Sequence, residues 1–297
     1  MRAAATLAAA LFLGLADAAI AEAEPAATTS QWWARRLIER GSMEPVVLGM
    51  RTNRMVQPNG LPLTVDAHIS FRFPAAAFNV VDLNGPSQRL GVQLWSRTLD
   101  PVRPDVDADL AACPRGDEHC RRFGPPNSRV LARRQAGEYI LRVEVTSVLF
   151  SEERRHSVLW WGSGMESRVP DRSRGPCSFQ YDETIGMLAT DRPREQRAAS
   201  ACNIIGYLGP DGTGRYSPRN FLKLEPDATP RFVVRCPWYA WEPTTERPWF
   251  CELQGYLGIW PLFLWVTSDS ATQWNETFLR VRDHLSRHVV GRSDPNP

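Results

Sequence analysis

The strictest pattern in the chain is an alternation of apolar and polar residues between positions 63 and 73. The apolar positions are Leu63, Val65, Ala67, Ile69, Phe71 and Phe73, and the polar ones are Thr64, Asp66, His68, Ser70 and Arg72. Because successive side chains of a strand point to opposite faces, this pattern predicts a strand with one buried and one solvated face. Such strands are typical of antiparallel sheets, since parallel strands are usually covered on both faces.

Further strands are predicted along the chain. The period recurs at Leu90, Val92 and Leu94, after a turn-prone Asn-Gly-Pro-Ser sequence, and again in the segment 137–150. Two apolar stretches, 232–239 and 250–267, predict the two long strands of a hairpin. Pro261 within the second stretch indicates an edge position or a bulge, because proline lacks the N–H that a central strand donates.

Helices are predicted at both ends of the mature chain. Segment 30–40 places Trp32, Trp33, Leu37 and Ile38 on about one side of a short helix. Residues 270–273 form a capping box that opens a second helix. Its apolar face consists of Trp274, Phe278, Val281, Leu285 and Val289. The sequence therefore predicts an α+β fold, predominantly antiparallel β, with a short N-terminal helix and a C-terminal amphipathic helix packed on the sheet.

The first residues predict export. Arg2 precedes an apolar and small-residue run from residue 3 to 15, followed by small residues at alternating positions. This order is typical of a signal peptide, here residues 1–21, with cleavage after Ala21 or Ala23. An uncleaved membrane helix is disfavoured because the run is shorter than the roughly 20 residues that a span needs. We expect a periplasmic or extracellular protein without a transmembrane anchor.

The mature region, 22–297, is long enough for one large domain or two closely packed β-rich domains. Turn-forming and charged residues cluster near 165–176, which is where a boundary between two domains is predicted. Segment 101–129 is rich in Pro, Asp and Arg and predicts a long excursion between strands.

The cysteines predict a disulfide-stabilised fold. Their number is even, and disulfides persist in the compartment to which a signal peptide directs a chain. Their spacing favours pairing in sequential order, Cys113 with Cys120, Cys177 with Cys202, and Cys236 with Cys251. The alternative is a zinc site, which requires about two to four residues between cysteines and further ligands nearby. The observed spacings do not meet that requirement.

Asp105, Asp107 and Asp109 are the candidate metal ligands, because their spacing resembles the opening of a calcium loop. The resemblance fails further along: Leu110 stands where such a loop turns on glycine, and Gly116 where it carries a bidentate glutamate. A solvated acidic loop is therefore the favoured interpretation over a metal site.

Histidines supply two further candidates. His284 and His288 lie one turn apart on the C-terminal helix, as in a two-histidine metal clip, but no third ligand is evident nearby. His68 shares the polar face of its strand with Asp66, so the two side chains are in reach of a hydrogen bond. Catalysis there requires a nucleophile, and the sequence does not identify one.

Four aromatic residues, Trp238, Tyr239, Trp241 and Trp249, cluster at the tip of the predicted hairpin. They are the candidate binding residues, because exposed aromatic side chains stack on sugars or anchor partner proteins. The alternative is a small local core beneath the disulfide that joins Cys236 and Cys251.

The favoured function is a non-enzymatic periplasmic or secreted protein that recognises another protein or an envelope component. No short catalytic or nucleotide-binding motif is present, no cofactor is expected, and a net charge of +2 does not favour nucleic-acid binding. The alternative is an extracytoplasmic hydrolase with carboxylate or histidine catalysis, since paired carboxylates can lie far apart in sequence. The oligomeric state is not predicted.

Overall fold

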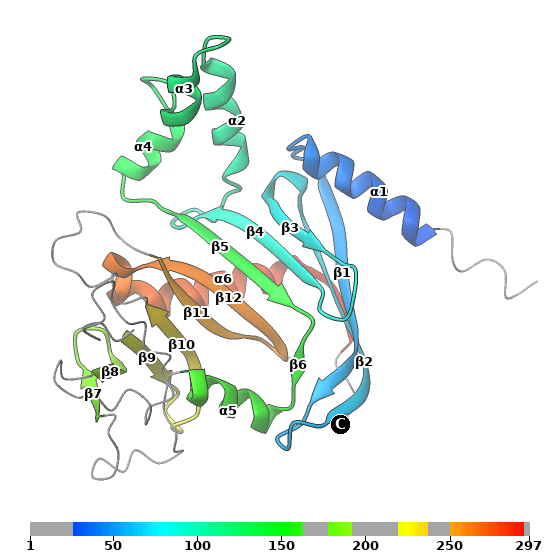
Figure 1. Cartoon of the computed structure of the whole chain (residues 1–297), viewed down its shortest axis with the longest axis vertical. Coiled ribbons are helices and arrows are strands. Elements are labelled where there is room, and N and C mark those ends of the chain that lie inside the picture. The colour runs from blue at the N-terminus through cyan, green and yellow to red at the C-terminus, as the bar shows by residue number, and fades with distance from the viewer. Residues whose placement is uncertain (1–25, 163–177, 192–218, 237–249, 294–297) are drawn as a thin grey trace, which may run out of the picture.

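The computed structural model describes residues 26–162, 178–191, 219–236 and 250–293. It shows an α+β fold made mostly of antiparallel sheet, as predicted (Figure 1). The predicted signal peptide, the domain boundary near 165–176 and the aromatic cluster at 238–249 lie outside the described residues. They stay predictions.

One sheet has four strands, in the order β13, β2, β1, β6. Their bounds are β1 (Pro45–Val56), β2 (Pro62–Pro74), β6 (Leu149–Phe150) and β13 (Val289–Ser293). The alternating segment forms β2 and buries Ala67, Ile69, Phe71 and Phe73, which confirms the one-faced strand. Leu63 is exposed; the pairing of β13 with β2 ends at His68, so no described strand flanks β2 on that side at Leu63.

The other sheet has nine strands, in the order β3, β4, β5, β12, β11, β10, β9, β8, β7, and is antiparallel throughout. Their bounds are β3 (Phe78–Asp82), β4 (Arg89–Trp95), β5 (Ile140–Thr146), β7 (Ser178–Asp182), β8 (Met187–Asp191), β9 (Arg219–Leu224), β10 (Pro230–Cys236), β11 (Phe250–Leu257) and β12 (Trp260–Thr267). Strands from both sides of the 165–176 segment belong to this one sheet.

The prediction of a single long strand over 250–267 is wrong. The segment is itself a hairpin, in which β11 and β12 pair up to Leu257 and Trp260 and the chain turns at Gly258, whose φ is 63°. Pro261 lies in an interior strand, not at an edge or bulge. The missing N–H is tolerated because pairing of β12 with β5 begins only at Leu262.

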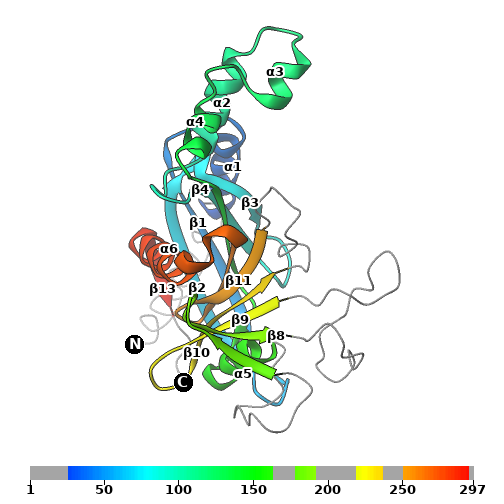
Figure 2. The same cartoon turned by 90° about the vertical axis from the view of Figure 1, so that its left-hand side faces the viewer.

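Six helices and two 3-10 turns are described. Their bounds are α1 (Ala26–Glu39), α2 (Arg103–Ala112), α3 (Glu118–Phe123), α4 (Arg129–Gln135), α5 (Glu152–Gly162), α6 (Trp274–His288), η1 (Ala75–Ala77) and η4 (Ser268–Gln273). Both predicted terminal helices are present, as α1 and α6, and α6 packs on the sheets (Figures 1 and 2).

The start of α6 differs from the prediction. The buried face of α6 includes Trp274, Phe278 and Val281, as its spacing predicts. The predicted capping box is absent, because residues 268–273 form the 3-10 turn η4 and the Ser270 hydroxyl donates to the carbonyl oxygen of Thr267 at 2.8 Å. That hydroxyl therefore ties η4 to the end of β12.

One continuous apolar core lies between the two sheets and α6. The ring of Phe278 on α6 packs against Phe232 of β10, with ring centroids 4.9 Å apart. Gly255 of β11 makes room for that ring, since a Cβ atom there would lie 2.6 Å from it. Close-packed interiors leave no space for such an atom, so glycine is required at this crossing.

Two of the predicted disulfides are present. Cys113 and Cys120 join the end of α2 to α3, and Cys236 and Cys251 join β10 to β11 at the predicted hairpin. Cys177 and Cys202 lie outside the described residues. Within the part of the chain that the structure describes, no helix is both long enough and apolar enough to cross a membrane.

Candidate functional site

A helical arm connects β4 to β5. We call residues 96–139 the arm; it contains α2, α3 and α4 and projects beyond the sheets (Figures 1 and 2). β4 and β5 are neighbours, paired from Arg89 and Thr146 to Trp95 and Ile140, so a short turn would suffice to join them. Long connections between paired strands are uncommon and usually carry function. The arm is therefore the candidate functional site.

The sequence predicts the excursion and the disulfide that holds it, but not its helices. Asp, Pro and Arg dominate α2, and these residue types are common in turns as well as at helix starts. Pro104 lies in the first turn of α2, where a missing N–H costs no helical hydrogen bond. The ambiguity of these residues hides the helix in the sequence.

The chain leaves β4 through a tight turn. The N–H of Leu99 donates to the carbonyl oxygen of Trp95 at 2.9 Å, and Leu99 adopts a left-handed φ of 61°. The chain then runs back beside β4, where Pro101 bridges to Leu94. This turn sets the direction in which α2 begins.

The chain re-enters the sheet through a glycine cap on α4. Gly137 has a φ of 80°, and its N–H donates to Arg134 while the N–H of Glu138 donates to Arg133. These two bonds form a Schellman motif, which satisfies the last carbonyl groups of a helix and requires a left-handed residue. The position thus needs glycine and directs the chain into β5.

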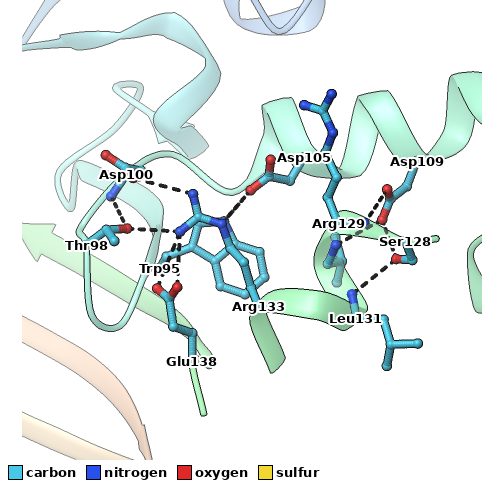
Figure 3. Close-up of polar contacts among 11 residues, drawn as sticks. Trp95, Thr98, Asp100, Asp105, Asp109, Ser128, Arg129, Leu131, Arg133 and Glu138 are labelled. Atoms are coloured by element: carbon cyan, nitrogen blue, oxygen red, sulfur yellow. Dashed lines mark hydrogen bonds and ion pairs between the residues drawn. The ribbon is translucent and has the colours of Figure 1, made fainter. Parts of the chain in front are cut away.

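Arg133 connects α2 to the two points where the arm meets the sheet, after β4 and before β5; we call this region the base of the arm (Figure 3). Its guanidinium lies 2.9 Å from Asp105 of α2, 3.2 Å from Glu138 before β5 and 3.4 Å from Asp100 after β4. It also lies over the ring of Trp95, 5.1 Å from the centroid, and the indole Nε1 of Trp95 donates to Asp105 at 2.9 Å. Burial alone would lower the pKa of Arg133, but the surrounding carboxylates raise it.

Asp109 ties α2 to the start of α4 (Figure 3). Its carboxylate accepts hydrogen bonds from the Ser128 hydroxyl and from the N–H groups of Arg129 at 2.7 Å and Val130 at 3.0 Å. Burial alone would raise the pKa of Asp109, but these hydrogen bonds outweigh it and lower the pKa below its usual value. The ionised carboxylate caps α4 and satisfies its first N–H groups.

The three candidate metal ligands therefore have separate roles. Asp105 and Asp109 face α4, whereas Asp107 pairs with Arg103 at 3.3 Å. Among the described residues, no three Asp, Glu, His or Cys side chains lie close enough together to hold a metal ion. On a helix, residues two positions apart point to different faces, so the spacing of these three aspartates does not by itself make a metal site.

Arg103 links the arm to the N-terminal helix. Its guanidinium donates to the carbonyl oxygens of Ile38 and Glu39, at 2.6 Å for the latter, which end α1. A cation at the C-terminal end of a helix stabilises it by satisfying unpaired carbonyl groups and opposing the helix dipole. The position of α1 is thereby tied to the base of the arm.

The outer surface of the arm is basic. The exposed arginines of the arm are Arg97, Arg115, Arg121, Arg122, Arg129 and Arg134, and its exposed acidic residues are Asp100, Asp107, Asp117 and Glu118. Of these acids, Asp117 and Glu118 lie at the tip, and the Asp117 carboxylate already accepts the N–H of Cys120 at 2.9 Å. Leu110 and Leu131, each nearly half exposed, add apolar area. The structure thus places six exposed arginines and two leucines on one projecting element, a set that the sequence alone did not single out.

The candidate histidines lie apart from the arm tip. His288 stacks on Phe73 of β2 with ring centroids 4.2 Å apart, and its Nδ1 donates to the carbonyl oxygen of His284 at 2.8 Å. Burial, followed by the charges of His288 and Arg287, lowers the pKa of His284 to about 4. The two histidines pack α6 against β2. The lowered pKa keeps the His284 ring neutral in this interface between α6 and β2.

His68 has a partner that the sequence did not reveal. The Ser293 hydroxyl of β13 lies 2.6 Å from Nδ1 of His68 and also accepts the backbone N–H of His68 at 3.1 Å. The two residues are far apart in the chain, and only the pairing of β13 with β2 brings them together. This contact is a serine–histidine hydrogen bond at the edge of the four-stranded sheet.

Comparisons with known proteins give one structural likeness. No protein-family model matches the sequence, and no curated protein matches it. The structure is similar to that of an immunity protein of the Stenotrophomonas maltophilia type IV secretion system, with a TM-score of 0.45 and 12% identity over 76% of this chain and 90% of that chain. A likeness at this level supports no statement about function.

Replacing Arg133 with glutamine should loosen the arm. The variant leaves Glu138 and Asp105, whose side chains are only 8% and 16% exposed, without their cation. We expect a loss of about 2 kcal/mol in the free energy of unfolding, measured by urea titration. Amide hydrogen exchange should quicken in α2 and α4. The matched control is Arg134→Gln, an exposed neighbour, which should change stability by less than about 0.5 kcal/mol. Equal effects of the two variants would contradict the role of Arg133.

Acidification should weaken the packing of α6. Because the pKa of His284 in the folded protein lies below its ordinary value of 6.5, the unfolded chain binds a proton between about pH 6.5 and 4 that the folded chain does not. The free energy of unfolding should therefore fall over this range, by no more than about 2 kcal/mol since the ring is partly solvated. The stability difference between His284→Phe and the native chain should change over the same range, measured by urea titration at each pH. Parallel curves would contradict this assignment.

Proposed function

We propose that this chain is a non-enzymatic, extracytoplasmic protein that binds a partner protein through the outer surface of the arm. The observation that carries the proposal is that the arm is rigidly held yet adds almost nothing to the core. Of the arm residues, Leu99 belongs to the buried core cluster and Tyr139 packs against it, both where the arm meets the sheet, while residues 100–138 contribute no member. Their order comes instead from the disulfide, the Asp109 cap and the Arg133 ion pairs.

A fixed surface favours recognition. Binding costs less conformational entropy when the contacting side chains stand on an ordered element. Three interactions order different parts of the arm. The disulfide holds the tip, Asp109 joins α2 to α4, and Arg133 joins both helices to the sheet. Long connecting segments that add little to the core are a common location for binding residues, because the scaffold positions them at the surface.

The chemistry of the arm indicates an acidic partner surface. Arginine is enriched at protein interfaces because its planar guanidinium forms paired hydrogen bonds with carboxylates. The arm has six exposed arginines against four exposed acidic residues, and two of these acids, Asp100 and Asp107, are already paired with Arg133 and Arg103. This excess gives an electrostatic preference for carboxylates. Leu110 and Leu131 supply apolar contact beside the charges.

The two disulfides support a location outside the reducing cytoplasm. They agree with the export predicted from residues 1–21. An acidic protein of the cell envelope or of the extracellular space is therefore the proposed class of partner.

Charge reversal at the tip tests the proposal. The chain with Arg115→Glu and Arg121→Glu should lose at least about tenfold in affinity for the partner, because an acidic partner surface would repel the new carboxylates. Partners are captured from an envelope fraction by cross-linking to the purified protein, and the dissociation constant is then measured with the purified partner.

The matched control is Arg287→Glu on α6, far along the chain from the arm, which should bind within about twofold of the native protein. Binding should also weaken with added salt. If the tip variant binds its partner as well as the native chain does, recognition does not occur through the arm.

The Ser293–His68 hydrogen bond favours a second candidate function, an extracytoplasmic hydrolase. A hydroxyl within 2.6 Å of an imidazole nitrogen is the contact that activates serine nucleophiles. Hydrolysis of activated esters by the purified protein, abolished in Ser293→Ala with folding intact, would establish this function. Hydrolysis that persists in the variant would exclude this serine as the nucleophile.

A further inference from the structure

Among the residues that the structure describes, strand β1 has an open edge in the four-stranded sheet. On one side β1 pairs with β2 along its length, whereas on the other it pairs with β6 only at Met55 and Val56. Among the described strands, none pairs with that second side of β1 between Pro45 and Arg54. An edge of this length presents backbone N–H and C=O groups on which another strand can pair.

The hydrogen bond at Arg51 shows which residues face the open edge. The N–H of Arg51 donates to the side-chain oxygen of Gln88 at 2.9 Å, so it points away from β2. Backbone groups of a strand alternate in direction with a period of two residues. The N–H and C=O groups of Val47 and Gly49 therefore point to the open edge as well, and Gln88 marks the end of the free stretch.

A groove accompanies this edge. It has a volume of about 640 Å³ and lies between α1 and the start of β1. Trp33 and Leu37 contribute the wall from α1, and Val46 and Val47 the wall from β1. Trp33 is 55% and Val47 48% exposed. Since Arg103 fixes the end of α1, the wall opposite the strand is held in place.

The surroundings of the edge are basic. Arg40 lines the groove, Arg51 lies at the end of the free stretch, and Arg72 stands opposite Val47 on β2. All three are exposed, and no ion pair with another described residue is formed by them. Glu44 is the carboxylate among the residues that line the groove.

We propose that β1 accepts an extended, acidic segment of a partner protein as an additional strand. Val47 and Gly49 supply the backbone hydrogen bonds, the groove beside Trp33 and Leu37 takes alternate apolar side chains, and the arginines pair with carboxylates of the segment. Strand addition combines these same elements, since main-chain bonds give affinity and side-chain pockets give specificity. A second copy of this chain fits less well, because it would bring like charges together.

This surface is distinct from the arm tip, so the inference does not rest on the proposed function. Arg115→Glu with Arg121→Glu should leave strand addition unchanged, and variants of β1 should leave binding by the arm tip unchanged. The two proposals therefore fail independently.

The probe is a capped synthetic decapeptide in which valine alternates with glutamate, compared with the same peptide carrying lysine in place of glutamate. Adding the glutamate peptide should slow hydrogen exchange of the Val47 and Gly49 amides by about tenfold or more, measured by NMR. The lysine peptide should not. Val47→Pro removes an outward N–H and should weaken binding by at least about tenfold. Val47→Thr keeps that N–H and should bind within about threefold of the native chain.

Folding of each variant is checked by its melting temperature. Arg51→Glu with Arg72→Glu, which leaves the backbone untouched, should reverse the preference toward the lysine peptide. Three results would overturn the proposal: no protection of Val47 and Gly49 at millimolar peptide, equal binding by Val47→Pro, or dimerisation of the native chain that Val47→Pro abolishes. The last would assign the edge to a second copy.

Discussion

The pairing of β4 with β5 is the constraint on which the arm depends. Their register brings Trp95 and Ile140 opposite each other, so the two ends of the arm leave the sheet side by side. Trp95, fully buried at the end of β4, then supports the Arg133 guanidinium and donates to Asp105. The paired strands thus fix the base of an element that contributes one residue, Leu99, to the buried core cluster.

Polar contacts replace apolar burial in the arm. A small helical unit without a core is unstable in isolation, because ordering each residue costs conformational entropy that no buried surface offsets. Arg133 opposes this cost at the base, Asp109 opposes it where α2 meets the start of α4, and the disulfide opposes it at the tip. Charge-assisted hydrogen bonds are stronger than hydrogen bonds between neutral groups. Bonds of this kind can therefore order an element that is attached to the sheet at one end.

Much of the fold could be predicted from local pattern. β2 and β5 carry their buried faces at every second residue, and α6 carries its own at helical spacing, because the pattern of burial repeats the geometry of the backbone. The hairpin within 250–267 was missed because a continuously apolar stretch has no period to mark where it turns at Gly258. The arm helices were missed for the opposite reason, since their polar residues are equally common in turns.

The sequence by itself determined the strand faces, the terminal helices and two cysteine pairings that the structure contains, because each depends on residues close together in the chain. Only the tertiary structure decided which polar groups meet. Asp105, Asp107 and Asp109 are neighbours in sequence but have three separate partners, whereas Ser293 and His68 are distant in sequence and hydrogen-bonded in space. A helix disperses near neighbours around its axis, and a sheet joins strands from opposite ends of the chain. Both proposed binding surfaces, on the arm and at β1, depend on these two features of backbone geometry.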